Sequence, residues 1–165
     1  MRRTRLITKN ILRAFADLVH VYQDRLYRLW IVSPWLSTQD DNQDSLILLT
    51  DALRDRGCTV ILVTRPPEAA WHQRALEHLR ANCDITVYFC STLHTKLYVL
   101  ECNGFRAAIL GSANFTARAN RTNRELAIEL RTTTENPVND DVAGIISELT
   151  EYASSLRGEP DVELA

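Results

Sequence analysis

STLHTKLYVLECNGFRAAILGSANFT, residues 91–116, is the stretch of the chain that decides the fold. Two runs rich in apolar and β-branched residues, 94–101 and 105–111, flank Cys102-Asn103-Gly104, a pattern typical of two adjacent strands joined by a tight turn. The stretch also carries polar side chains where a buried strand would hold valine, namely His94, Lys96, Ser112 and Asn114. We therefore expect these strands to carry a functional site.

The rest of the chain alternates between helical and strand patterns. Apolar residues recur at helical spacing in four segments, residues 4–24, 43–57, 65–83 and 138–157. Apolar runs predict further strands at residues 29–32, 58–64, 85–89 and 124–131. Strand–helix alternation followed by adjacent strands indicates an α/β fold, in which a mixed β-sheet is flanked by helices on both faces.

Length and charge limit the organisation of the chain. With 165 residues we expect one domain, residues 1–157, and an acidic, frayed tail at residues 158–165. The net charge is −2, but from Thr132 onward there are eight acidic residues and one basic residue, which leaves 18 basic and 13 acidic residues before that point. This mildly basic body permits a phosphate-rich partner.

The sequence predicts a cytoplasmic protein without a metal or other cofactor. The basic residues at the start are not followed by the apolar core of a signal peptide, and no apolar run is long enough to span a bilayer. The four cysteines lack any CxxC spacing, so we expect free, buried thiols. Cys90 and His94 would supply only half of a zinc site.

The polar side chains of residues 91–116 are placed to meet. His94 and Lys96 are two apart on the predicted strand and share one face, and Ser112 and Asn114 share a face if their segment stays extended. The hairpin would bring the two pairs together, and Gly111 would let a ligand approach the backbone. An imidazole surrounded by ammonium and amide donors suits a phosphoryl group.

These residues resemble the signature of the phospholipase D superfamily, H-x-K-x4-D followed by G-S-x-N and N-x-E. The resemblance rests on HTKLYVLE, GSANFT and NRE, from His94 to Glu125, and the preceding strand–helix order fits the phospholipase D-like fold. One position departs from the signature, because Glu101 stands where the family has aspartate. In the family that acid is largely structural and lies past the end of the strand.

The resemblance implies a role for each residue. His94 would attack phosphorus and form a phosphohistidine, or protonate the leaving oxygen in a paired site. Lys96 and Asn114 would hold the phosphate oxygens, Ser112 would contact the same group or brace its neighbours, and Glu125 would orient His94 by accepting a hydrogen bond. No metal would be needed.

The single motif implies a partner, because the family's chemistry uses two facing histidines. We expect a homodimer with the site on its two-fold axis, acting as an endonuclease-like phosphodiesterase on nucleic acid, more readily DNA than RNA. Restriction or anti-phage systems, with further subunits, are settings known for small members of the superfamily. Three arginines after the Gly-Ser-Ala-Asn turn could contact neighbouring phosphates or belong to a solvated loop, namely Arg118, Arg121 and Arg124.

Two alternative functions and several other residues complete the interpretation. A lipid phosphodiesterase or phosphatidyl transferase would need a membrane-binding rim, and no segment has that pattern. A catalytically weak nucleic-acid-binding subunit is the other alternative.

We interpret His20, His72 and His78 as ordinary helix residues. We interpret Trp30, Trp35 and Trp71 as core or dimer-contact residues in preference to base-stacking residues. Ser33 and Pro34, at a strand end, are candidates for a groove wall.

Overall fold

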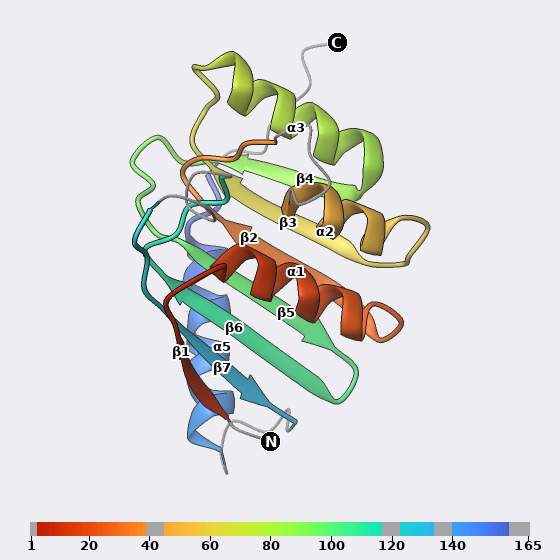
Figure 1. Ribbon diagram of the computed structural model, residues 1–165, viewed down its shortest axis with the longest axis vertical. Helices are drawn as coiled ribbons and strands as arrows, with labels where there is room; N and C mark the ends of the chain where they lie inside the picture. Colours follow the sequence, from red (N-terminus) through yellow and green to blue (C-terminus); the bar gives the residue numbers. More distant parts are fainter. Residues whose placement is uncertain (1–2, 39–44, 117–122, 134–139, 159–165) are drawn as a thin grey trace.

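The computed structural model describes residues 3–38, 45–116, 123–133 and 140–158. Its elements, in chain order, are β1 (Thr4–Ile7), α1 (Ile11–Tyr22), β2 (Leu26–Val32), α2 (Ser45–Leu53), β3 (Thr59–Thr64), α3 (Ala70–Asn82), β4 (Asp84–Phe89), β5 (Leu97–Cys102), β6 (Phe105–Gly111), β7 (Ala127–Thr132) and α5 (Asp141–Ser155). The seven strands form one sheet in the order β1-β7-β6-β5-β2-β3-β4 (Figure 1).

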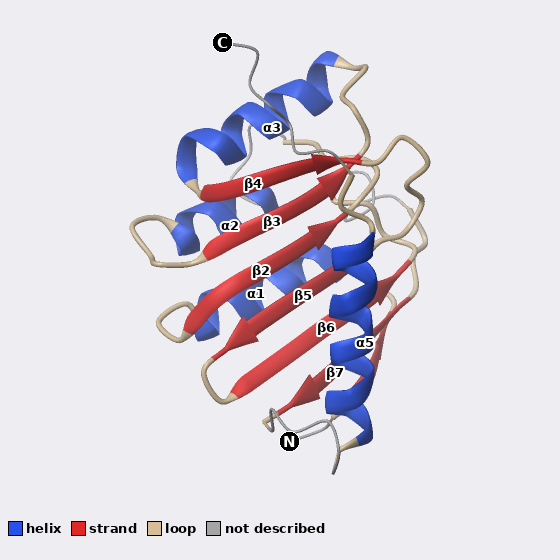
Figure 2. Cartoon of the chain, turned by 180° about the vertical axis from the view of Figure 1, so that it is seen from behind, coloured by secondary structure: helices blue, strands red, loops and turns tan. Residues whose placement is uncertain are grey.

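The sheet is mixed, as the sequence predicts. Strands β2, β3 and β4 are parallel, whereas β5 runs antiparallel to β2, and β6, β7 and β1 continue the antiparallel half. Helices α1, α2 and α3 cover one face, and Figure 2 shows α5 crossing the other. The expected α/β fold with helices on both faces is confirmed.

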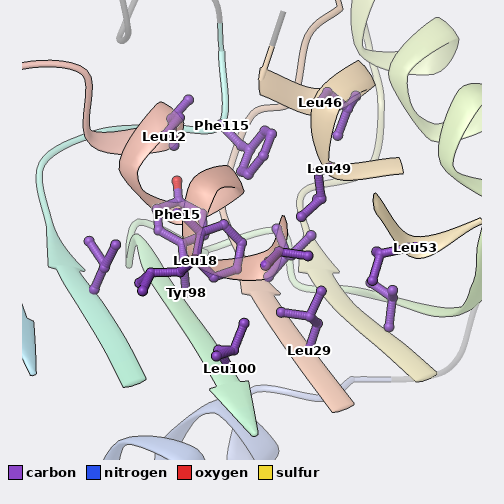
Figure 3. Close-up of a cluster of buried hydrophobic side chains, with 14 of the residues drawn as sticks. Leu12, Phe15, Leu18, Leu29, Leu46, Leu49, Leu53, Tyr98, Leu100 and Phe115 are labelled. Atoms are coloured by element: carbon purple, nitrogen blue, oxygen red, sulfur yellow. The ribbon is translucent and has the colours of Figure 1, made fainter. Parts of the chain in front are cut away.

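The larger part of the core lies beneath α1, α2 and α3. Phe15 of α1 packs against Tyr98 of β5 and Phe115, with ring centroids 5.4 and 6.4 Å apart (Figure 3). Leucines of α2 and α3 extend this cluster over β2 and β3. The three aromatic rings thus join the first helix, the hairpin and the Gly-Ser-Ala-Asn segment in one packed unit.

The smaller part of the core lies beneath α5. Trp30, Val32, Leu97 and Val99 face this helix and pack with its Ile146. Asp140 precedes the helix as its N-terminal cap, and its carboxylate accepts a hydrogen bond from the Ala143 amide at 3.0 Å.

Strand directions bring the predicted site residues to one edge of the sheet. Because β5 runs opposite to β2, its first residue, Leu97, pairs with the last residue of β2, Val32. Leu97 also pairs with Leu110, near the end of β6, and Gly111 pairs with Ala127, the first residue of β7. The segments before β5 and β7 and after β2, β3 and β6 therefore meet at this end of the strands. We call it the catalytic edge, after the roles predicted for these residues.

The predicted helix at residues 4–24 is wrong in its first part. Residues 4–7 form β1, which pairs antiparallel with β7, and Asn10 adopts φ 53° before α1 begins. Ile7 and Ile11 fit helical spacing, but backbone pairing with a strand more than 100 residues away overrides this local pattern. Three other elements begin later than predicted. Helix α3 begins after both prolines, and β5 and β7 each begin three residues late.

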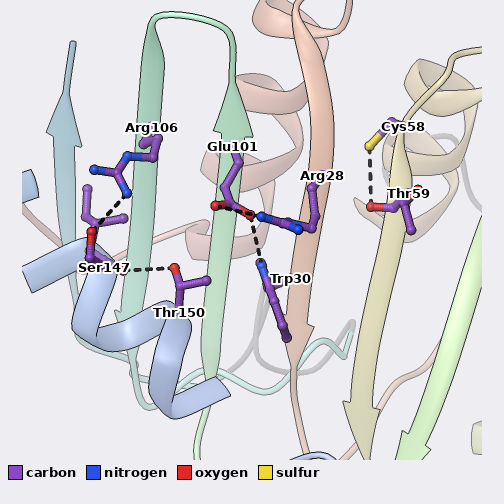
Figure 4. A network of polar contacts seen from close by, with 9 residues as sticks. Arg28, Trp30, Cys58, Thr59, Glu101, Arg106, Ser147 and Thr150 are labelled. Atoms are coloured by element: carbon purple, nitrogen blue, oxygen red, sulfur yellow. Dashed lines mark hydrogen bonds and ion pairs between the residues drawn. The ribbon is translucent and has the colours of Figure 1, made fainter. Parts of the chain in front are cut away.

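Glu101 lies inside β5, not past the end of the strand as the resemblance implies. Its buried carboxylate accepts hydrogen bonds from Arg28 Nε at 2.5 Å and Trp30 Nε1 at 3.0 Å (Figure 4). This ion pair raises the pKa of Arg28. The residue sits at the end of β5 remote from the catalytic edge, so its longer side chain serves a structural contact between β5 and β2.

The four cysteines are free thiols as expected, but only Cys58 and Cys102 are buried, whereas Cys83 and Cys90 are half-buried. Burial raises the pKa of Cys58 to about 12, and those of Cys83 and Cys102 to about 11, so these thiols stay protonated near neutral pH. Across the described parts of the chain, no cluster of three metal-ligating side chains occurs, and no helix has the length and apolar character needed to cross a bilayer.

Candidate active site

A buried hydroxyl ties two loops of the catalytic edge together. Ser33 Oγ, directly after β2, donates a hydrogen bond to the Trp35 carbonyl at 2.7 Å and accepts one from the Phe115 amide at 2.9 Å. The Ser37 amide donates to the Phe115 carbonyl, and Leu36 forms a parallel bridge with Phe115. The segment after β2 is thereby paired with the Gly-Ser-Ala-Asn segment, and it forms part of the wall of the cavity described below.

Two further contacts set the path of the Gly-Ser-Ala-Asn segment. Tyr98, fully buried in β5, donates its hydroxyl to the Ala113 carbonyl at 2.6 Å, and burial raises its pKa. At Gly111 a Cβ atom would lie 2.2 Å from the Leu126 carbonyl oxygen of the neighbouring chain segment. The Leu126–Ala127 backbone therefore requires a glycine at this position, and the approach of a ligand to Gly111 stays a prediction.

His94 and Lys96 lie just before β5, not on it as predicted. The His94 side chain is exposed, whereas Lys96 is half-buried, and its Nζ donates to the His94 carbonyl at 2.7 Å and lies 3.4 Å from His94 Nδ1. Between them, Thr95 bonds Tyr152 of α5 at 2.9 Å, so it points to the other face of the sheet. The alternation expected for an extended segment thus holds.

The charge on Lys96 is set by its surroundings. Burial lowers the pKa of Lys96, the carboxylate of Glu125 opposes this shift, and the cation of Arg65 adds to it. Glu125 and Arg65 are therefore electrostatic neighbours of the ammonium. The backbone agrees, because the Gly111 amide donates to the Lys96 carbonyl and Gly111 pairs with Ala127, two residues after Glu125.

Ser112 braces Glu125. Its hydroxyl donates to Glu125 Oε2 and accepts from the Leu126 amide at 3.0 Å, while the Ser112 amide donates to the Leu126 carbonyl. Of the two roles considered for Ser112, the structure supports the bracing one. No hydrogen bond links Glu125 to His94 within the described residues, so its orienting role stays a prediction.

Two further predicted residues, Asn114 and Arg124, lie in the described segments at the catalytic edge. Asn114 is half-buried, and its Oδ1 atom has no hydrogen-bond partner among the described residues. Arg124 is exposed beside Glu125. Arg118 and Arg121 lie outside the described residues. The edge thus gathers an imidazole, an ammonium, an amide and a braced carboxylate, a set suited to a tetrahedral oxyanion.

An aromatic group beside the site was not predicted as part of it. Trp35 and Trp71 have ring centroids 6.1 Å apart, and both lie against His72 of α3, which is fully buried. The Thr64 hydroxyl donates to the Pro34 carbonyl, so it accepts from His72 Nε2 at 3.1 Å. These contacts join β2, β3 and α3, and no local pattern in the sequence marks them.

Comparison with known families identifies the class of protein that this fold and site define. The model of the family described as cardiolipin synthase, PLD-like domain, matches residues 25–150. The chain belongs to this family, and it is a phosphodiesterase of the phospholipase D superfamily. Comparison with curated proteins gives no significant match.

Solved structures share the fold at low sequence identity. Nuc from Salmonella typhimurium, a phospholipase D family member, is 16% identical with a TM-score of 0.68, covering 95% of this chain and 97% of Nuc. NucT from Helicobacter pylori is 13% identical with a TM-score of 0.62, covering 93% and 94% of the two chains. Polyphosphate kinase from Porphyromonas gingivalis is 14% identical with a TM-score of 0.61, and this chain spans 24% of it. At these identities the likeness concerns the fold.

His72 predicts a pH dependence of stability. Burial lowers the pKa of His72 from its usual 6.5, so the native state holds it neutral while the unfolded chain takes up a proton. The stability that neutral His72 contributes is fully present well above pH 6.5, and it is lost as the pH falls toward the lowered pKa. Between pH 7.5 and 5.0 we expect wild-type protein to lose about 1–2 kcal/mol more unfolding free energy than His72→Gln, whose amide can still donate to Thr64.

Urea unfolding at several pH values measures this difference. His20→Gln, at an exposed position at the end of α1, is the matched control and should keep the wild-type pH dependence. Equal pH dependence of wild type and His72→Gln would show that His72 does not titrate as the buried contacts require.

Proposed function

We propose that this protein is a metal-independent phosphodiesterase that cleaves nucleic acid, with His94 as nucleophile. The observation that carries the proposal is the grouping of His94, Lys96, Asn114 and the braced Glu125 at one edge of the sheet. Lys96 supplies a fixed positive charge next to an exposed imidazole, so charge developing on phosphate oxygens can be stabilised without a metal ion. The resemblance of HTK, GSAN and NRE to the superfamily signature supports the same assignment.

The reaction proceeds in two displacements. His94 forms a P–N bond as the P–O bond to the leaving group breaks, and a second histidine donates a proton to the departing oxygen. Water then loses a proton to that second histidine and attacks phosphorus, which breaks the P–N bond and restores His94. Glu125 accepts a hydrogen bond from the N–H group of His94, and Lys96 and Asn114 hold the non-bridging oxygens.

The second histidine is His94 of a second copy of the chain, because the two displacements need facing imidazoles and one chain carries one motif. Exposed apolar side chains flank the site. Leu126 follows Glu125 and is 55% exposed, and Leu6 on β1 is 68% exposed. Tyr152, which bonds Thr95 next to His94, is 46% exposed. These side chains support a homodimer that closes over the catalytic edge.

Nucleic acid is the proposed substrate because the chain before Thr132 is mildly basic and Arg124 is exposed beside the site. We place the activity in the cytoplasm, on DNA in preference to RNA. A role in restriction or anti-phage defence stays a prediction. The name of the matched family, cardiolipin synthase, makes a lipid phosphodiester the second candidate.

A nuclease assay in EDTA tests this proposal. Purified protein should cleave plasmid or oligonucleotide DNA in the presence of EDTA, and His94→Ala should lower the rate by about 10³-fold or more, because the variant has no nucleophile. His20→Ala, an exposed histidine outside the site, should leave the rate unchanged.

Each other outcome has a defined meaning. Activity that requires Mg²⁺ would refute the mechanism, and turnover of labelled phosphatidylglycerol without DNA cleavage would favour the lipid candidate. A folded dimer that binds DNA and cleaves neither substrate would indicate a binding subunit of a larger complex.

Mixed dimers test the shared site. When tagged wild-type and His94→Ala chains are mixed and refolded in equal amounts, a site built from both histidines leaves only wild-type pairs active, so specific activity should be roughly a quarter of the all-wild-type value. A fall to one half, proportional to the wild-type fraction, would show that each chain acts alone.

A further inference from the structure

A cavity opens beside the proposed catalytic residues. Its volume is about 520 Å³, within the range of small-molecule sites in proteins. The residues that line it come from loops of the catalytic edge and from the start of α3, namely Trp35, Ser37, Thr38, Trp71, Asn114, Thr116 and Asn123. We call it the Trp35–Trp71 pocket.

The pocket offers firmly supported aromatic surface. Trp71 is 40% exposed, although it belongs to a helix packed on the core, and its ring lies nearly parallel to His72, with an interplanar angle of 20°. Trp35 has the Arg65 guanidinium 5.2 Å from its ring centroid. Arg65 in turn donates from Nε to the Leu93 carbonyl at 2.7 Å, which fixes it next to the segment that carries His94. Both indoles are therefore held in place before any ligand arrives.

The pocket and the catalytic group share Asn114. This residue, assigned to the phosphate oxygens, also lines the pocket, and its Oδ1 is buried without a partner among the described residues. The described lining contains hydroxyl and amide side chains and no carboxylate. Arg65 and Lys96 add positive charge nearby. A ligand that fits has a flat apolar face, polar edges and an attached anion.

We propose that the Trp35–Trp71 pocket binds an unpaired nucleobase of single-stranded nucleic acid, next to the phosphodiester held by Asn114 and Lys96. The inference rests on the proposed function and narrows it to a preference for single strands. Bases in a duplex are already stacked and paired, whereas an unpaired base can lay its face on an indole. Thr38 and Asn123 line the pocket with polar side chains suited to the base edge.

Direct binding tests this proposal without depending on cleavage. A fluorescein-labelled dT oligonucleotide and a hairpin duplex of equal length are titrated, at one salt concentration, into the His94→Ala protein with and without Trp71→Ala. Trp71→Ala should weaken single-strand binding by about 10- to 100-fold, because a base–aromatic contact is lost. Duplex binding, which depends on phosphate contacts, should change by less than about 2-fold.

Two variants serve as controls. Tyr27→Ala removes an aromatic side chain with the same 40% exposure at the opposite end of β2, and should leave binding unchanged. Trp71→Phe keeps an aromatic face and should restore most of the affinity, which separates loss of stacking from local unfolding. Oligonucleotide should also quench tryptophan fluorescence in wild-type protein, and less so in Trp71→Phe.

Three results would overturn the proposal: unchanged single-strand affinity in Trp71→Ala, equal loss of single-strand and duplex affinity, or binding of phosphatidylglycerol vesicles that Trp71→Ala abolishes while oligonucleotides do not bind. These results are distinct from failure of the proposed function. Protein that binds single strands through Trp71 but does not cleave DNA in EDTA would keep the pocket and refute the nuclease. Cleavage of duplex DNA in EDTA without Trp71-dependent binding would support the nuclease and refute the nucleobase pocket.

Discussion

The geometry of the catalytic edge depends on the buried hydroxyl of Ser33. One oxygen atom donates to the Trp35 carbonyl and accepts from the Phe115 amide, so it joins segments 82 residues apart. The contact works because β2 and β6 end at the same edge of the sheet, on either side of β5. Without it, the Phe115 amide and the Trp35 carbonyl would lose a hydrogen-bond partner, and the Ser37 amide and the Leu36–Phe115 bridge would be left to hold the two segments together.

The two ends of β5 have different roles: one end stabilises the fold, and the other leads into the proposed catalytic residues. At one end of β5, Glu101 is buried against Arg28 and Trp30, a satisfied polar contact suited to stability. At the other end, His94 is exposed, and the pKa of Lys96 is lowered by partial burial. Exposure of the proposed nucleophile is expected if another surface, either the substrate or a second copy, must cover the site before reaction. The exposed Leu126, directly after Glu125, fits the same view.

The sequence predicts those features that depend on contacts between residues close together in the chain. The hairpin at Asn103-Gly104 and the placement of His94, Lys96, Ser112 and Asn114 follow from alternation and one tight turn, and the structure brings these residues to one edge. Prediction failed where distant segments decide the outcome. β1 is a strand because β7 lies beside it, and the Trp35–Trp71 pocket arises where residues after β2, after β6 and before β7 meet the start of α3. None of these contacts leaves a periodic signal in the chain.

The central claim is that His94 attacks phosphorus, and isolation of the covalent intermediate tests it most directly. Wild-type protein is mixed with an oligonucleotide labelled with ³²P at internal phosphates, quenched in alkaline detergent within milliseconds to seconds, and digested for mass spectrometry. The account predicts label on the peptide that contains His94, stable to base, labile to acid and absent from His94→Ala. Full cleavage activity with no label trapped at any time, or label on another residue, would contradict it.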